Sequence, residues 1–154
     1  MVKFMTHAWE EVLKPMISRP KAVQVAALCC RDTDHGVDVL MITSRGTGRW
    51  TIPKGWPIKG KNGAQSALQE AWEEAGVKAA ESQTDPIGSY DYVKHRGNGA
   101  AEPVQTYVYR VAVNRMSSKY PESHQRERQW MPAEVAANLV REPQLRDLLL
   151  QIND

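Results

Sequence analysis

Apolar positions dominate two neighbouring stretches near the start of the chain, residues 21–31 and 37–44. A segment rich in Asp and Gly, residues 32–36, separates them, so the pair predicts a β-hairpin. Further stretches have the apolar character or the two-residue alternation that is typical of strands: residues 50–52, 87–94 and 104–113. The pattern therefore predicts a sheet whose strands come from both halves of the chain.

One uninterrupted helical pattern, residues 64–75, lies between these strands. It contains no Pro or Gly, and its Ala, Leu, Gln and Glu residues are good helix formers. Asn62 is placed to act as the N-cap, Gln65 completes a capping box, and Gly76 suits the left-handed residue that ends a helix. A projection at about 100° per residue predicts an apolar face that packs on the core: Ala64, Leu68, Ala71, Trp72 and Ala75.

Three glutamates, Glu70, Glu73 and Glu74, fall on the opposite side of this helix. At these spacings like charges repel one another and destabilise the isolated helix. A hard divalent cation offsets that repulsion, because Mg²⁺ prefers oxygen ligands and takes a few carboxylates while a substrate phosphate supplies the rest. Taken alone, the pattern fits an ordinary solvated acidic face better than a metal site, because acidic helix faces are common.

A loop rich in Gly and Lys precedes the helix, and loop and helix together resemble the Nudix box. That motif is a Gly, five residues, a Glu, seven residues, and then Arg-Glu-apolar-any-Glu-Glu-any-Gly-apolar. The chain matches it at Gly55, Glu70, Ala71, Glu73, Glu74, Gly76 and Val77. It departs from it at Lys61, where the family has Glu, and at Gln69, where the family has Arg.

The lead-in to the box, SRGTGRWTIPKG at residues 44–55, is similar to one branch of the family. That branch hydrolyses diphosphoinositol polyphosphates and dinucleoside polyphosphates. The resemblance extends over residues 23–140 and implies an α/β (α+β) fold, an α/β/α sandwich with a mixed sheet between helices. It also implies a pyrophosphohydrolase that cleaves a phosphoanhydride bond with Mg²⁺ or Mn²⁺.

Carried onto this chain, the resemblance implies that Glu73 and Glu74 are metal ligands and that Glu70 is a ligand or the base. All three are therefore the predicted catalytic and metal-binding residues. Gly55 lets the backbone turn across the end of the helix and is also a predicted substrate-binding residue. The cations predicted to hold substrate phosphates are Arg45, Arg49, Lys54 and Lys59, and each is also compatible with a solvated loop position.

Two later loops contain further candidates. His95 and Arg96 begin a glycine-rich loop and either contact a polyanionic substrate or form a solvated hairpin tip. Some Nudix enzymes place an additional Glu in a later loop as a ligand or base, and Glu122 and Glu127 are candidates here. The sequence does not choose between them.

The two departures from the box leave two functions open. If the missing Glu and Arg supported each other, the three remaining glutamates still serve a hydrolase, because such a cluster is costly without a cation. Otherwise the site has become a Nudix-like module that binds a nucleotide or polyphosphate without cleaving it. The exact substrate is not determined by the sequence.

The 154 residues suit one domain, predicted to occupy residues 21–154 after an N-terminal extension of residues 1–20 that begins with a short helix. Two helices, residues 133–140 and 143–151, are predicted near the end, with Pro132 at the first helical position of the former. The polar segments expected to connect elements are residues 78–84 and 114–129.

Charge and cysteine content narrow the class of protein. The net charge of +2 gives no reason to expect nucleic-acid binding, and no apolar run approaches the ~20 residues that span a membrane. Cys29 and Cys30 are adjacent in an apolar run, which favours buried thiols in a cytoplasmic protein. The expected partner is a small anionic phosphate compound, and the resemblance allows a homodimer.

Overall fold

The computed structural model describes residues 21–95 and 97–154, so the predicted extension with its helix, and Arg96, lie outside the described residues. Within them the strands are β1 (Ala22–Thr33), β2 (Gly36–Thr43), β3 (Trp50–Thr51), β4 (Lys54–Gly55), β5 (Val77–Ser82), β6 (Gly88–His95), β7 (Ala101–Met116) and β8 (Arg128–Pro132). The helices are α3 (Gly63–Ala75), α4 (Ala133–Leu139) and α5 (Pro143–Gln151). No helix of the described residues is both long and apolar enough to cross a membrane.

The strands form one mixed sheet. Strand β1 pairs in parallel with β7, in a register from Ala22 opposite Val104 to Cys30 opposite Ala112. The remaining pairs are antiparallel: β1 with β2 and β4, β2 with β3 and β8, and β7 with β5 and β6. The predicted hairpin of β1 and β2 is therefore confirmed.

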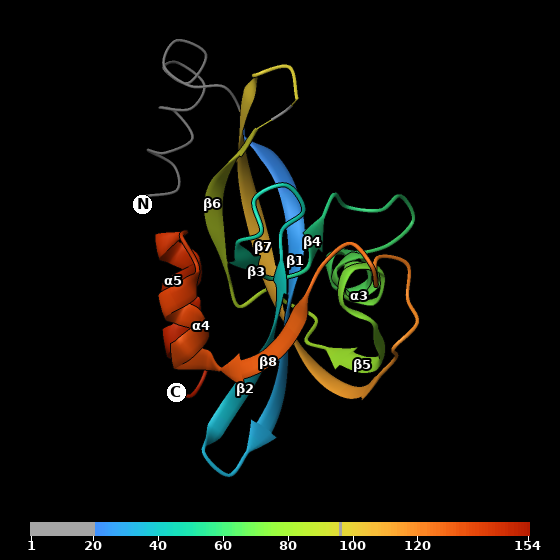
Figure 1. Ribbon diagram of the computed structural model, residues 1–154, viewed down its shortest axis with the longest axis vertical. Helices are drawn as coiled ribbons and strands as arrows, with labels where there is room; N and C mark the ends of the chain where they lie inside the picture. The colour runs from blue at the N-terminus through green and yellow to red at the C-terminus, as the bar shows by residue number, and fades with distance from the viewer. Residues whose placement is uncertain (1–20, 96) are drawn as a thin grey trace, which may run out of the picture.

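Helices cover both faces of this sheet, as Figure 1 shows: α3 lies on one side, and α4 and α5 lie on the other. Two buried clusters match these two layers, one between the sheet and α3 and one between the sheet and the C-terminal helices. Successive β1 side chains enter different clusters, Cys29 the first and Cys30 the second. This burial on both faces explains the continuous apolar run of β1. The predicted α/β/α sandwich is confirmed.

The capping box and the C-terminal glycine predicted for α3 are confirmed. The Asn62 side chain accepts a hydrogen bond from the Gln65 backbone N–H at 2.8 Å, and the Gln65 side chain accepts one from Asn62 N–H at 2.9 Å. Gly76 ends the helix at φ 73°, in the left-handed region where only glycine is unstrained. These caps fix where α3 begins and ends relative to β4 and β5.

Three predictions at element boundaries were wrong. Residues 114–129 are not all connector, because β7 continues to Met116 and β8 begins at Arg128. The polar segment after α3 is not a connector: it contains strand β5, whose register with β7 shifts twice between Val77 and Ala80. Those irregularities break the two-residue alternation that would have revealed a strand. Pro132 is not at N1 of α4 but ends strand β8 and serves as the N-cap residue.

Candidate active site

A cavity of about 520 Å³ opens between α3 and the ends of several strands, and both ends of the box contribute to it. Its walls come from α3, from β1, β3 and β4, from the end of β6 and from the connecting segments between elements. Its acidic members are Glu70 and Glu74 of α3, Glu122 of the loop after β7, and Glu142 before α5. The cavity therefore gathers carboxylates from three separate parts of the chain.

Glu70 lies directly against the backbone of Gly55. A Cβ added to Gly55 would stand 2.0 Å from Glu70 Oε1 and 2.4 Å from its Cδ, so glycine alone leaves room for the carboxylate. Burial raises the Glu70 pKa to about 7, and the neighbouring charges of Glu74, Glu73 and Glu122 add to the rise. A carboxyl group with that pKa is suited to accept a proton near neutral pH.

Glu74 is buried, with 8% of its surface exposed, and two cations compensate for its charge. Burial raises its pKa, whereas Arg126 and Lys54 oppose the rise. Arg126 Nη2 lies 3.6 Å from Glu74 Oε2, and the Lys54 backbone N–H donates to Glu74 Oε1 at 3.3 Å. Because Lys54 begins β4 next to Gly55, one short strand contacts both glutamates.

The Glu73 side chain is placed differently from those of Glu70 and Glu74. Its Oε2 accepts a hydrogen bond from the Gln69 side-chain amide at 2.6 Å, and it does not line the cavity. The three predicted glutamates thus belong to two i,i+4 pairs of α3: Glu70 with Glu74, and Glu73 with Gln69. Catalytic and ligand roles for Glu73 remain predictions.

The face of α3 that packs on the sheet differs in part from the predicted apolar face. The buried residues of the helix are Ser66, Ala67, Ala71, Glu74 and Ala75. Leu68 is half-buried but packs against the buried cluster beneath α3, as predicted, and Trp72 is half-buried. Close approach of α3 to β1 favours Ala over Trp on the contact face.

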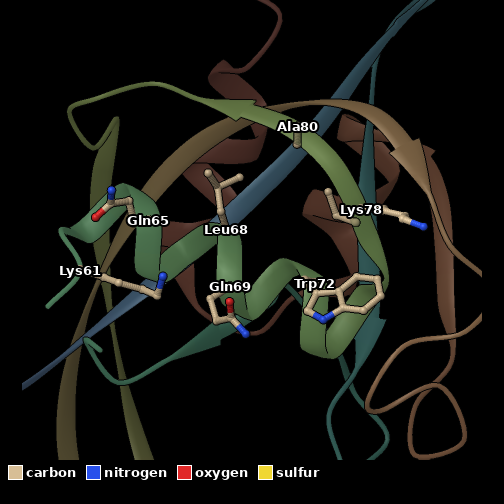
Figure 2. Close-up of a pocket in the computed structure, with 8 residues that line it drawn as sticks. Lys61, Gln65, Leu68, Gln69, Trp72, Lys78 and Ala80 are labelled. Atoms are coloured by element: carbon tan, nitrogen blue, oxygen red, sulfur yellow. The ribbon is translucent and has the colours of Figure 1, made fainter. Parts of the chain in front are cut away.

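Leu68 and Trp72 line a second, shallower cavity of about 440 Å³ between α3 and β5. Figure 2 shows its side chains, which include Lys61 and Gln69. Both departures from the Nudix box therefore lie on the side of α3 away from the Glu70 and Glu74 cavity. This explains how Lys61 and Gln69 are accommodated without an added positive charge among those carboxylates.

The rest of the first cavity is rich in positive side chains. Of the predicted phosphate-binding residues, Arg45, Arg49, Lys54 and Gly55 line it, whereas Lys59 does not. The candidate His95 also lines it. Three cations that the sequence did not single out join them: Lys94, Arg126 and Arg141. Lys94 is the penultimate residue of β6, so the two-residue alternation of that strand could have indicated its direction.

Of the two loop glutamates, the structure brings Glu122 into the cavity. Its backbone N–H donates to the Glu73 carbonyl at 3.0 Å, which fixes the loop to the C-terminal half of α3. Glu127 is exposed and does not line the cavity, and its backbone pairs with Thr43 instead.

The donor set fits a divalent metal ion at a phosphate site. Across residues 21–95 and 97–154, no three His, Cys, Asp or Glu side chains lie close enough to hold a metal ion by themselves. Mg²⁺ at such sites, however, takes one or two carboxylates and completes its shell with water and substrate phosphates. Glu70 and Glu74, with Glu122 beside them, offer only oxygen donors, which are the donors that Mg²⁺ and Mn²⁺ prefer.

Comparison with known proteins agrees with this architecture, since the NUDIX domain profile matches residues 20–151. The chain belongs to the Nudix family. Nudix hydrolase 13, mitochondrial, of Arabidopsis thaliana is 29% identical over 71% of this chain and 56% of its own length. Human diphosphoinositol polyphosphate phosphohydrolase 3-beta is 27% identical over 76% of this chain and 68% of its own.

Solved Nudix structures share the fold. The C. elegans Ap4A hydrolase superposes with a TM-score of 0.61, at 18% identity, over 85% of this chain and 95% of that protein. The NUDIX domain of Shewanella oneidensis NrtR, complexed with ADP ribose, gives 0.61 at 14% identity, over 94% of each chain. The Nudix proteins among the relatives are hydrolases of pyrophosphate-containing compounds, and such enzymes generally need a divalent metal ion.

Proposed function

We propose that this protein hydrolyses a phosphoanhydride bond in a polyphosphate substrate with the help of Mg²⁺ or Mn²⁺. The observation that carries the proposal is one cavity with two Nudix-box glutamates on one wall and a group of cations around them. Carboxylates suit a metal ion, and cations suit the phosphates that remain outside the metal's reach. Neither the glutamates alone nor the cations alone would point to phosphoanhydride cleavage.

The glutamates and the cations of the cavity have different roles in the proposed reaction. Glu70 and Glu74 would hold the metal ion, with Glu122 close enough to assist. When bound, the ion supplies neutralisation of phosphoryl charge and makes the attacking water more acidic. Where Glu70 does not bind the ion, it is placed to accept the proton of the attacking water. Lys54 and Arg126 partly balance the charge of Glu74.

The cations at the mouth of the cavity favour a substrate with several phosphates. Arg45 and Arg49 come from the loop before β3, Lys94 from the end of β6, and Arg141 from the segment before α5. Such a spread of charge suits a diphosphoinositol or dinucleoside polyphosphate better than a compound with a single diphosphate. The names of the human and C. elegans relatives support the same two classes.

A second candidate function is binding of a nucleotide or polyphosphate without cleavage. The observation that favours it is the hydrogen bond from Gln69 to Glu73, which directs one box glutamate away from the cavity. A site with fewer metal-facing carboxylates keeps its phosphate-binding cations while its rate of hydrolysis falls.

A panel of pyrophosphate-linked compounds separates these functions. It comprises diadenosine polyphosphates, a diphosphoinositol polyphosphate, nucleotide sugars and nucleoside triphosphates, each tested with Mg²⁺, with Mn²⁺ and with chelator. We expect metal-dependent release of phosphate or nucleotide from the polyphosphate members, strongly reduced in Glu70→Gln. Absence of turnover on every compound, with binding retained by calorimetry, would establish the binding module instead. Glu73→Gln, run beside these, measures whether that glutamate contributes to hydrolysis.

A further inference from the structure

The cavity contains one arginine whose contacts are almost entirely internal. The Arg126 side chain is 10% exposed, although it belongs to a loop. Its Nε donates to Glu122 Oε1 at 2.9 Å, its Nη2 lies 3.6 Å from Glu74 Oε2, and its Nη1 donates to the Thr43 carbonyl at 3.2 Å. One guanidinium thus joins α3, the loop after β7 and the end of β2.

This arrangement differs from that of the other cations in the cavity. Arg45 also approaches Glu122, at 3.9 Å, but its side chain is 63% exposed and its Nη1 donates to Gln125 Oε1 at 2.8 Å. The Lys54 ammonium lies near Thr51 Oγ1 at 3.4 Å and above the Tyr92 ring, and only its backbone N–H contacts Glu74. Arg126 is therefore the described cation whose side chain contacts two of the cavity's carboxylates in a fixed geometry.

The helix itself provides no such cation. At the box position where Arg is expected stands Gln69, and its amide donates to Glu73 rather than to Glu70 or Glu74. A planar guanidinium donates from several N–H groups in a rigid fork, so it can hold two carboxylates and a carbonyl at once. A neutral amide cannot supply that charge.

We propose that Arg126 is a positioning residue that holds Glu74 and Glu122 at the site from a loop outside the helix. This inference rests on the proposed function, because it concerns residues that serve the hydrolysis. It assigns Arg126 no contact with the reacting atoms. Its effect reaches the reaction through the two carboxylates that it orients.

The test compares Arg126→Met and Arg126→Lys with the wild type on whichever polyphosphate the protein turns over. For Arg126→Met we expect kcat to fall about 100-fold, as when preorganised electrostatic contacts are lost, while KM changes by less than about threefold. Lys keeps the charge without the fork, so Arg126→Lys is expected to recover part of the lost kcat.

Two matched variants distinguish positioning from folding. Arg128→Met removes a neighbouring arginine whose guanidinium contacts the Ala75 and Ser117 carbonyls, so it should lower stability and leave kcat near the wild-type value. Arg146→Met removes an exposed arginine of α5 that does not line the cavity and should change neither. Urea unfolding of every variant shows that kinetics are measured on folded protein.

The outcomes separate the inference from the proposed function. A wild type without metal-dependent turnover overturns both. An active wild type with unchanged kcat in Arg126→Met overturns the positioning role alone. A raised KM with normal kcat in that variant would make Arg126 a substrate contact and would also overturn it.

Discussion

Replacement of Gly55 by alanine would displace the Glu70 carboxylate, the proposed base or metal ligand, with little change elsewhere. The φ of Gly55 is not positive, so its backbone suits an alanine. The added Cβ, however, would lie 2.0 Å from Glu70 Oε1, whereas real Cβ atoms keep at least 3.0 Å from such neighbours. The carboxylate must therefore move by 1.0 Å or more.

The expected loss of rate is larger than the expected loss of stability, because the group that moves is a carboxylate in the cavity. A displacement of 1 Å at a catalytic group costs about 100-fold in rate, which corresponds to ~2.7 kcal/mol of activation free energy. The free energy of unfolding should change by less than about 1 kcal/mol, because Glu70 has a flexible side chain and Ala reduces the entropy of the unfolded chain. Gly55→Ala should therefore be a folded protein of low activity.

The assay is kcat/KM on the preferred substrate, measured beside urea unfolding. Gly97→Ala is the matched control, since a Cβ there meets no atom within 4 Å and φ is not positive. In a Glu70→Ala background, Gly55→Ala should have no further effect, because the group that it displaces is gone. Wild-type activity in Gly55→Ala would refute the reasoning, and so would a full additional loss in the double variant.

Three further predictions concern stability and reactivity. Asn62→Ala removes half of the capping box and should lower the free energy of unfolding by about 1 kcal/mol in urea titrations, whereas Asn62→Asp should retain most of it. Arg128→Met loses two charged hydrogen bonds at 2.8 and 2.9 Å and should cost roughly 2 kcal/mol, with an unchanged midpoint contradicting the contacts. Burial raises the pKa of Cys30 to about 11 and that of Cys29 further, so a thiol reagent at neutral pH should react with neither until the protein unfolds.

Features that depend on nearby residues could be predicted from the sequence. The caps of α3, the β1–β2 hairpin and the burial of Cys29 and Cys30 each follow from residues within a few positions of one another. The Glu70 and Glu74 pair was also accessible, because i,i+4 neighbours share a helix face.

Contacts between distant segments could not be predicted in the same way. Arg126 and Glu122 reach Glu74 only because their loop hydrogen-bonds to Glu73 and to the end of β2, and no local signal in a polar segment indicates such contacts. The direction of Glu73 was likewise hidden, since it depends on the neighbouring Gln69 side chain and on the rotation of α3 against the sheet. Strand β5 was missed because its irregular pairing hides the two-residue period.

The two departures from the Nudix box also have a structural meaning that the motif alone did not give. Lys61 and Gln69 line the second cavity, so neither side chain forms part of the wall with Glu70 and Glu74. The loss of a family residue at a motif position is therefore a weaker sign of lost activity when that position faces away from the cavity.

The most direct test of the account is the rate of hydrolysis by Glu74→Gln, with Mg²⁺ saturating and the most active polyphosphate of the panel as substrate. Gln keeps the size of the side chain and removes the negative charge that a metal ion needs. The account predicts a loss of at least about 100-fold relative to the wild type. A rate equal to that of the wild type would contradict a metal-dependent reaction at Glu70 and Glu74.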